Sequence, residues 1–229
     1  MQKIVDDTEI TAIVIKDSDF ARLNGTLSTN QYIFYADAHD YEMMCIKNEQ
    51  VRHDLLENNG IVYSEVLYDK SFEDLKLLSY IQWYNYTNHL GYEASQVSVG
   101  DKNDTQLRDY QVLHDEMILK TLWSRQKTAR KNGDDPNSVT VNPIPWSVID
   151  QFMTDHSGTD KYELTRGHGF ITRFIHNVKM QHPEFQQSSE NGLKKVLHPC
   201  FRAEHFMVTN LYAALQQWQI DHSMRILAV

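Results

Sequence analysis

The stretch from Ile10 to Met44 constrains the fold of this chain most, because it contains two apolar runs that each end in acidic residues. The first run, Ile10–Ile15, is rich in β-branched residues and predicts a strand that is buried on both faces. The second run, Tyr32–Tyr35, is aromatic and apolar and predicts a neighbouring strand. In an open parallel sheet, ligands bind beyond the carboxyl ends of the strands. The stretch therefore predicts a small α/β unit with a site at that edge.

Carboxylates follow both predicted strands directly. Asp17 and Asp19 come after the first strand, and Asp37, Asp40 and Glu42 come after the second. Hard divalent cations prefer such oxygen ligands, and Mg²⁺ is typically held by one or two carboxylates, waters and a substrate phosphate. Such ions stabilise the attacking and leaving oxygens of a phosphodiester displacement. We therefore expect Asp17, Asp19, Asp40 and Glu42 to bind Mg²⁺ or Mn²⁺, and Asp17, Asp19 and Glu42 to be the catalytic residues.

The same acidic residues also have a simpler interpretation. Acidic residues after strands are often solvated loop charges or N-caps of the next helix. The segment from His39 to Glu42 can open a helix, because the first turn of a helix favours negative charge. Both interpretations are open at the level of the sequence.

At these residues the chain resembles a family. The segment Asp17-Ser18-Asp19-Phe20, followed by Arg22-Leu23, is similar to the D-x-D that follows a core strand in the TOPRIM-like proteins of bacterial defence systems. The segment Asp37–Met44 is similar to the H-D-x-E-M segment that follows the next strand in that family. The family is related to the OLD-type nucleases and includes the TOPRIM effector of the PARIS anti-phage system. A looser, helical similarity extends to about Gly91.

The resemblance implies a metal-dependent nuclease-type effector of an anti-phage defence system that cleaves phosphodiester bonds in DNA or RNA. It also implies an ATPase partner that controls the effector, and we expect a homo-oligomer. The ATPase would be a separate chain, because this sequence has no G-x-x-x-x-G-K-[ST] motif. Serine hydrolase chemistry is excluded in the same way by the lack of G-x-S-x-G.

One part of the family pattern is missing. TOPRIM domains begin with a strand that bears a Glu-Gly-x-x-Asp motif, and no such motif lies upstream of Asp17. Three explanations are open: the chain is the C-terminal part of a longer polypeptide, another chain completes the half-domain, or the site is catalytically degenerate. In the last case we expect a TOPRIM-like scaffold that acts as a protein-interaction or dimerisation module.

Composition limits the class of protein further. The chain has 229 residues, of which 41% are hydrophobic, and this is enough for one core or for two small domains. A net charge of −9 argues against a generic nucleic-acid binder, since phosphate contacts come from Lys and Arg. Cys45 and Cys200 lack CxxC spacing, which argues against zinc and predicts two small buried side chains in a reducing cytoplasm. No signal peptide is visible and no run approaches the ~20 apolar residues of a membrane helix, so we expect no membrane contact.

The pattern turns helical after the first third of the chain. We expect a partial TOPRIM-like α/β domain over residues 1–68 and a mainly α-helical domain over 69–229. Ile61–Leu67 is predicted to be extended, and 186–192 to be a loop. Helical spacing and caps predict helices over 43–58, 71–90 with Ser71 as cap, 105–131 with Asp104 as cap, 146–154, 164–180 and 202–220.

Further candidate sites lie in the helical part. The end of the helix over 105–131 is basic, and its side chains either complement the helix dipole in water or bind nucleic acid; they are Arg125, Lys127, Arg130 and Lys131. Four aromatic residues of the helix over 71–90 either stack on bases or belong to a core; they are Tyr80, Trp83, Tyr84 and Tyr86.

A different catalytic interpretation starts from the helix over 105–131. Arg108-Asp109 followed by His114 fits the R-x(4–6)-H pattern of HEPN-type RNases, in which Arg and His act on the RNA 2′-hydroxyl and phosphate. His114-Asp115 is also an HD dipeptide, which His89 would extend toward an HD-type phosphohydrolase set. Both patterns are short and occur by chance in helical proteins.

Overall fold

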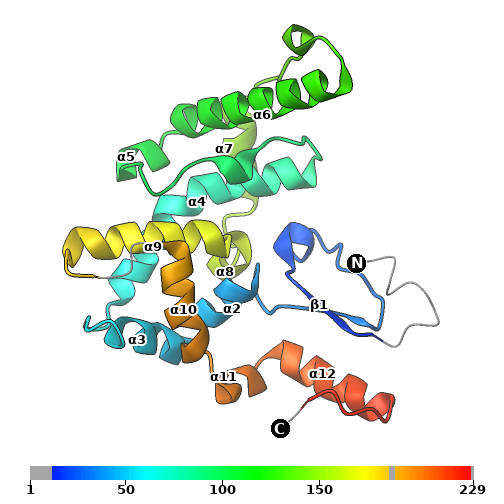
Figure 1. The fold of residues 1–229 in the computed structure, drawn as a ribbon, viewed down its shortest axis with the longest axis vertical. Coiled ribbons are helices and arrows are strands. Elements are labelled where there is room, and N and C mark those ends of the chain that lie inside the picture. Colours follow the sequence, from blue (N-terminus) through cyan, green and yellow to red (C-terminus); the bar gives the residue numbers. More distant parts are fainter. Residues whose placement is uncertain (1–11, 186–188, 228–229) are drawn as a thin grey trace.

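Two short parallel strands precede a series of helices in residues 12–185 and 189–227, the ranges that the computed structural model describes (Figure 1). β1 (Val14–Lys16) pairs in parallel with β2 (Ile33–Tyr35), with Val14 opposite Ile33. The second predicted strand is thereby confirmed. The first is shorter than predicted, and its beginning at Ile10 lies outside the described residues. Burial on both faces was wrong for β1, because Ile15 is 53% exposed on a sheet in which β1 pairs with β2 alone.

The rest of the described chain is largely helical, as expected for an α/β part followed by a helical region. Three short 3₁₀ segments connect longer elements: η1 (Asp19–Ala21), η2 (Ala94–Gln96) and η3 (Pro136–Ser138). The α-helices are α2 (Tyr41–Lys47), α3 (Glu49–Glu57), α4 (Glu65–Thr87), α5 (Asp104–Leu107), α6 (Tyr110–Asn132), α7 (Trp146–Asp155), α8 (Lys161–Leu164), α9 (Gly167–Gln181), α10 (Glu190–Cys200), α11 (Ala203–Met207) and α12 (Asn210–Asp221).

Polar caps divide three of the helices that apolar spacing predicts as continuous. Asn48 accepts a hydrogen bond from a first-turn amide of α3 and separates it from α2. Asp109 does the same at the start of α6, and Thr209 at the start of α12. The cap of α5 is Asn103 and not Asp104. A side-chain oxygen that satisfies first-turn N–H groups starts a new helix even where the apolar spacing continues.

The predicted start of one helix and the predicted end of one loop were wrong. Ser71 is not a cap: it lies inside α4, where its Oγ donates to the carbonyl of Leu67 (2.8 Å), and the extended segment ends at Ser64. The expected domain boundary after residue 68 therefore falls within α4. The predicted loop over 186–192 lies partly outside the described residues, and its end is helical because Ser189 caps α10. Pro199 lies inside α10, one residue before its end at Cys200.

α4 and α9 lie at the centre of the main hydrophobic core. Tyr68 of α4 stacks on Phe174 of α9, with ring centroids 4.5 Å apart, and Phe72 lies at the same distance from Phe170. The core continues through α2 and α10, which lie beside α9 in Figure 1, and through α3, which packs against α2 and α10. Cys45 and Cys200 are free and buried, which confirms the expected small buried side chains. In the described ranges, no helix has both the length and the apolar composition that crossing a bilayer would require.

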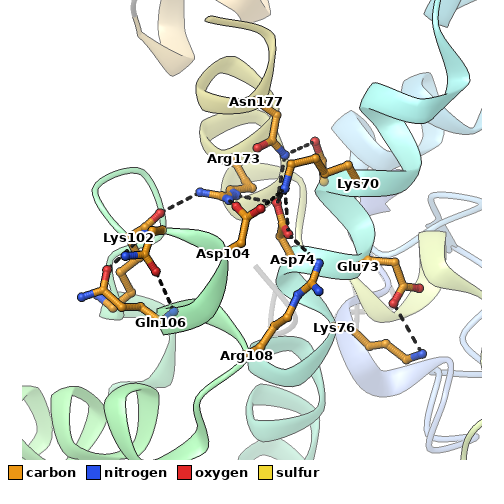
Figure 2. A network of polar contacts seen from close by, with 12 residues as sticks. Lys70, Glu73, Asp74, Lys76, Lys102, Asp104, Gln106, Arg108, Arg173 and Asn177 are labelled. Atoms are coloured by element: carbon orange, nitrogen blue, oxygen red, sulfur yellow. Dashed lines mark hydrogen bonds and ion pairs between the residues drawn. The ribbon is translucent and has the colours of Figure 1, made fainter. Parts of the chain in front are cut away.

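A buried polar network joins α4, α5 and α9 (Figure 2). Asp74 and Arg173 both have 0% exposed side chains, and Arg173 Nε lies 2.9 Å from Asp74 Oδ2. Arg173 also pairs with Asp104 and donates Nη1 to the carbonyl of Lys102 (2.8 Å). Burial raises the pKa of Asp74, but its hydrogen bonds from Asn177 and the nearby cations outweigh this, so the net shift is downward. Asp74 is therefore an ionised carboxylate in the interior.

Candidate functional site: an acidic cluster beside the sheet

The segments that follow β1 and β2 are joined to each other, and this places their acidic residues at one edge of the sheet. The parallel pairing of the strands aligns their carboxyl ends. Three hydrogen bonds then connect the segments: Asp19 N to His39 O (2.9 Å), Ser18 Oγ to Ala38 O (2.6 Å) and Tyr41 N to Asp17 Oδ1 (3.1 Å). We call Asp17, Asp19, Asp40 and Glu42 the acidic cluster.

The pKa of Asp17 is raised from its usual value. Asp17 is an exposed residue, and the partial burial of its carboxyl is the first cause of this shift. The amide of Tyr41 lowers the pKa of Asp17, whereas the nearby charges of Asp19 and Glu42 raise it further. The structure thus brings these three sequence-predicted carboxylates within electrostatic reach of one another.

Asp19 has an unusual backbone conformation. Its φ of 44° lies in the left-handed region, which Asp tolerates better than most residues because its short side chain hydrogen-bonds locally. The hydrogen bond from its amide to His39 O keeps it there. Its carboxylate is exposed, and Oδ1 lies 3.7 Å from Nε2 of His39.

Glu42 is neutralised by a lysine from a distant part of the chain. Lys194 of α10 places its Nζ 2.5 Å from Glu42 and 2.8 Å from Glu190. Burial raises the pKa of Glu42, but the hydrogen bond and charge of Lys194 outweigh this and lower it overall. Glu42 is therefore an ionised carboxylate with an internal counter-ion.

Asp40 fits the simpler interpretation of these acidic residues, that of a helix cap. Its Oδ1 accepts from the amide of Met43 in α2 (2.9 Å), and its Oδ2 accepts from the amide of Gly167 at the start of α9 (2.7 Å). A Cβ at Gly167 would lie 2.5 Å from Asp40 Oδ1 and 2.6 Å from Glu42 Cβ, so only glycine fits this close approach. Asp37 turns away from the cluster and accepts hydrogen bonds from the first amides of α12.

The exposed carboxylates of the cluster suit an open Mg²⁺ site, which waters and a substrate complete. They do not suit a site in which protein side chains supply all the ligands. Within residues 12–185 and 189–227, no group of three or more His, Cys, Asp or Glu side chains is arranged to hold a metal ion. Asp17 and Asp19 are the exposed members of the cluster, whereas Asp40 and Glu42 are engaged by amides and by Lys194. Mg²⁺ is commonly bound by one or two carboxylates while waters and a substrate phosphate complete its octahedron. The donor set of Asp17 and Asp19 fits that chemistry.

His39 is a buried, neutral neighbour of the cluster. Its side chain is 1% exposed, and Nδ1 lies 3.1 Å from the carbonyl of Glu163, so this nitrogen carries the proton and donates it. Burial lowers the pKa of His39 to about 4. Burial has the opposite effect on Asp40 and raises its pKa to about 6. The edge of the sheet thus holds a buried histidine whose pKa is lowered and a buried aspartate whose pKa is raised.

We expect His39 to make the stability of the protein depend on pH. Its folded pKa of about 4 lies below the unfolded value of 6.5, so the native state binds fewer protons and gains stability as pH rises through this window. Relative to His39→Asn, which keeps a side-chain donor for Glu163 O, the wild type should gain about 3 kcal/mol between pH 4 and 6.5, the free energy of a shift of this size. Urea unfolding at pH 4, 5 and 6.5 measures this difference.

The matched control for this prediction is His89→Asn. His89 is exposed and has a left-handed φ of 52°, which asparagine tolerates. The difference in stability from the wild type should change more with pH for His39→Asn than for His89→Asn. A constant difference for His39→Asn over the same range would show that His39 titrates normally in the native state. Asp40 opposes His39 in the wild type and is present in both variants, so it cancels from the comparison.

Sequence reasoning did not find the residues that α9 and α10 bring to the cluster. His168 Nδ1 lies 2.5 Å from Glu190 Oε1, and Lys194 links this pair to Glu42. No local pattern relates Lys194 to an acidic residue near the N-terminus. The one available signal was the pair Gly167 and Gly169 at the start of a predicted helix, where a glycine needs a packing reason.

The basic residues at the end of α6 lie elsewhere. Figure 1 shows α6 at one end of the molecule and α12 at the other. Arg125 donates to the carbonyl of Leu90 (3.0 Å) and lies over the ring of Tyr92, so part of its charge serves the fold. Lys127 lies over the exposed ring of Trp123. Arg130 and Lys131 are exposed in the last turn, and nucleic-acid binding by this end of α6 remains a prediction.

The other sequence candidates have structural contacts. Arg108 pairs with Asp74 (3.3 Å). His114 is buried, and its Nε2 accepts from the amide of Ile144 (3.0 Å). Tyr80 and Trp83 are buried in a second, smaller hydrophobic cluster. Their burial agrees with the interpretation that these two aromatic residues belong to a core.

Comparisons with known proteins assign no family to this chain. No protein-family model, no curated protein and no solved structure matches this chain.

Proposed function

We propose that this chain binds Mg²⁺ or Mn²⁺ at the acidic cluster and is a TOPRIM-like, metal-dependent nuclease-type effector that hydrolyses phosphodiester bonds in DNA or RNA. The observation that carries the proposal is the hydrogen-bonded pair of loops after β1 and β2, which holds Asp17, Asp19 and Glu42 within reach of one another's charge. The exposed carboxylates of Asp17 and Asp19, at the carboxyl edge of parallel strands, suit a cation and a phosphate.

Each residue of the cluster has a part in this proposal. Asp17 and Asp19 would hold the ion, and the amide of Tyr41 fixes the orientation of the Asp17 carboxylate. The ion would polarise the scissile phosphate and lower the pKa of the attacking water. Asp40 ties α2 to α9 and so holds the wall of the site in place. Glu42 would join the ligands only on release of Lys194.

Cation dependence tests the proposal on the unmodified protein. Binding of Mn²⁺ is measured by titration, and cleavage is measured on labelled single- and double-stranded DNA and RNA with Mg²⁺, with Mn²⁺ or with EDTA. We expect binding at cation concentrations up to millimolar, cleavage of at least one substrate with either ion, and no cleavage in EDTA until excess ion is returned. Equal cleavage in EDTA, or no cation binding at millimolar concentration, would contradict the proposal.

A second candidate function is a TOPRIM-like scaffold for protein interaction or dimerisation. The ion pair of Glu42 with Lys194 favours it, because a neutralised glutamate needs no cation. Lys194→Met separates the two functions. In a cation site, the freed Glu42 adds a ligand and tightens Mn²⁺ binding, whereas in a scaffold the same change only lowers the free energy of unfolding.

The proposed effector would act with other chains. Control by an ATPase partner and assembly into a homo-oligomer both belong to the proposal. They are supported by the resemblance of the segments around Asp17–Asp19 and Asp37–Met44 to the defence family. Light-scattering mass of the protein alone, and with a candidate ATPase, measures both.

A further inference from the structure

A cavity of about 510 Å³ lies between α4, the segment 95–100 and the start of α9. Its lining from α4 and the segment 95–100 mixes apolar with polar side chains, namely Leu75, Leu78, Val97 and Val99 with Ser79, Gln82, Ser95 and Ser98. The start of α9 contributes Arg166 and His168. The volume of the cavity is within the range of small-ligand sites.

The cavity adjoins the acidic cluster through a chain of ion pairs. Glu190 lines the cavity and pairs with Lys194 (2.8 Å), which in turn pairs with Glu42 (2.5 Å). His168 also lines the cavity, and its charge lowers the pKa of both Asp17 and Glu42. A molecule that occupies the cavity would therefore be linked to Glu42 through Glu190 and Lys194.

Arg166 brings positive charge to the polar lining of the cavity. In the part of the chain that the structure describes, no hydrogen bond or ion pair engages the guanidinium of Arg166, which is partly buried. The carboxylate of Glu190 shares Lys194 with Glu42, and it also lies 2.5 Å from Nδ1 of His168. The start of α9 adds partial positive charge, since intrahelical hydrogen bonding begins with the amide of Phe170.

We propose that this cavity binds one nucleotide unit of the nucleic-acid substrate. The phosphate would lie at Arg166 and the start of α9, and the base would lie against α4 and the segment 95–100, whose hydroxyl and amide groups can hydrogen-bond to its edge. This inference rests on the proposed function and extends it, because it assigns the position of the substrate beside the acidic cluster. Arg166 is then a substrate-binding residue, since a guanidinium matches the geometry of a phosphate.

Gly169 offers a direct way to close the cavity. It lines the cavity, and a Cβ at this position would meet no atom within 4 Å. Gly169→Leu therefore adds a bulky side chain at a lining position where the Cβ has room. Arg166→Met removes the charge at a position that makes no side-chain cap to α9. Gly158→Leu is the matched control, because a Cβ there also meets no atom within 4 Å and Gly158 does not line the cavity.

The test is fluorescence anisotropy with labelled single-stranded DNA and RNA hexanucleotides in EDTA, where cleavage does not interfere. We expect the wild type and Gly158→Leu to bind one of the probes equally well, and Gly169→Leu and Arg166→Met each to weaken binding at least about tenfold, which is ~1.4 kcal/mol. Circular dichroism melting checks that the variants fold, and Arg166→Met alone decides the result if Gly169→Leu does not fold.

Equal binding by all four proteins, or no binding by the wild type, would overturn the inference. Competition by a free mononucleotide at a concentration similar to that of the hexanucleotide supports a single-unit site. The result is independent of the cation test, since binding here is measured without metal. Loss of metal-dependent cleavage with intact hexanucleotide binding would therefore contradict the proposed function and leave the cavity assignment standing.

Discussion

Replacing Asp17 with asparagine is expected to reduce metal-dependent cleavage at least about 100-fold, which corresponds to ~3 kcal/mol of transition-state stabilisation. Asparagine keeps the size of the side chain and an oxygen that can accept from the amide of Tyr41, so the loops after β1 and β2 stay joined. The charge that would hold the ion is removed. The effect is read from single-turnover cleavage rates with Mg²⁺ and Mn²⁺.

The same variant should be at least as stable as the wild type. Burial and the charges of Asp19 and Glu42 raise the pKa of Asp17, so ionisation of Asp17 opposes folding in the absence of metal. A loss of activity together with unchanged or higher stability distinguishes a ligand from a structural residue. Asp19→Asn should lose cleavage in the same way.

Asp134→Asn is the matched control, because Asp134 is exposed and follows α6 at a distance from the cluster in sequence and fold. It should cleave at the wild-type rate. Wild-type cleavage by both Asp17→Asn and Asp19→Asn would remove these aspartates from the mechanism.

Asp74→Ala is expected to lower the free energy of unfolding by about 3–5 kcal/mol, the usual cost of removing one partner of a buried ion pair. Asp74 accepts hydrogen bonds from Arg173 and Asn177, and it lies 3.1 Å from Lys70 Nζ (Figure 2). Without it, the fully buried guanidinium of Arg173 keeps Asp104 and the carbonyl of Lys102 but loses its buried counter-charge. Urea denaturation at neutral pH measures the loss.

Two comparisons make this stability prediction specific. Asp134→Ala removes an exposed aspartate and should change stability by no more than about 0.5 kcal/mol. The double variant Asp74→Leu with Arg173→Met replaces the buried pair by apolar side chains and should be more stable than Asp74→Ala alone, because no buried charge is left unpaired. A loss below about 1 kcal/mol for Asp74→Ala would mean that water or Lys70 compensates Arg173.

Local patterns of sequence were sufficient for some of the elements. β2 was predicted from an aromatic run and α7 from helical spacing over 146–154, and both form where expected. The grouping of Asp17, Asp19 and Glu42 followed from one general rule, that parallel strands present their carboxyl ends at the same edge. Burial of Cys45 and Cys200 also followed from residue type and spacing alone.

Other features depended on side chains whose role no local pattern reveals. Asn48 and Asp109 stop one helix and start another, although the apolar spacing around them continues. A cap competes with helix continuation by a small free energy, and packing of the flanking segments decides the outcome.

The sequence by itself determined which carboxylates follow the strands, because residue order and the direction of parallel strands are local properties. Only the tertiary structure decided what surrounds those carboxylates. Gly167 approaches Asp40 and Glu42, and Lys194 neutralises Glu42, because α9 and α10 pack against α2. Contacts between segments so far apart in the chain depend on how whole helix faces pack together. Residue spacing within one segment therefore does not predict them.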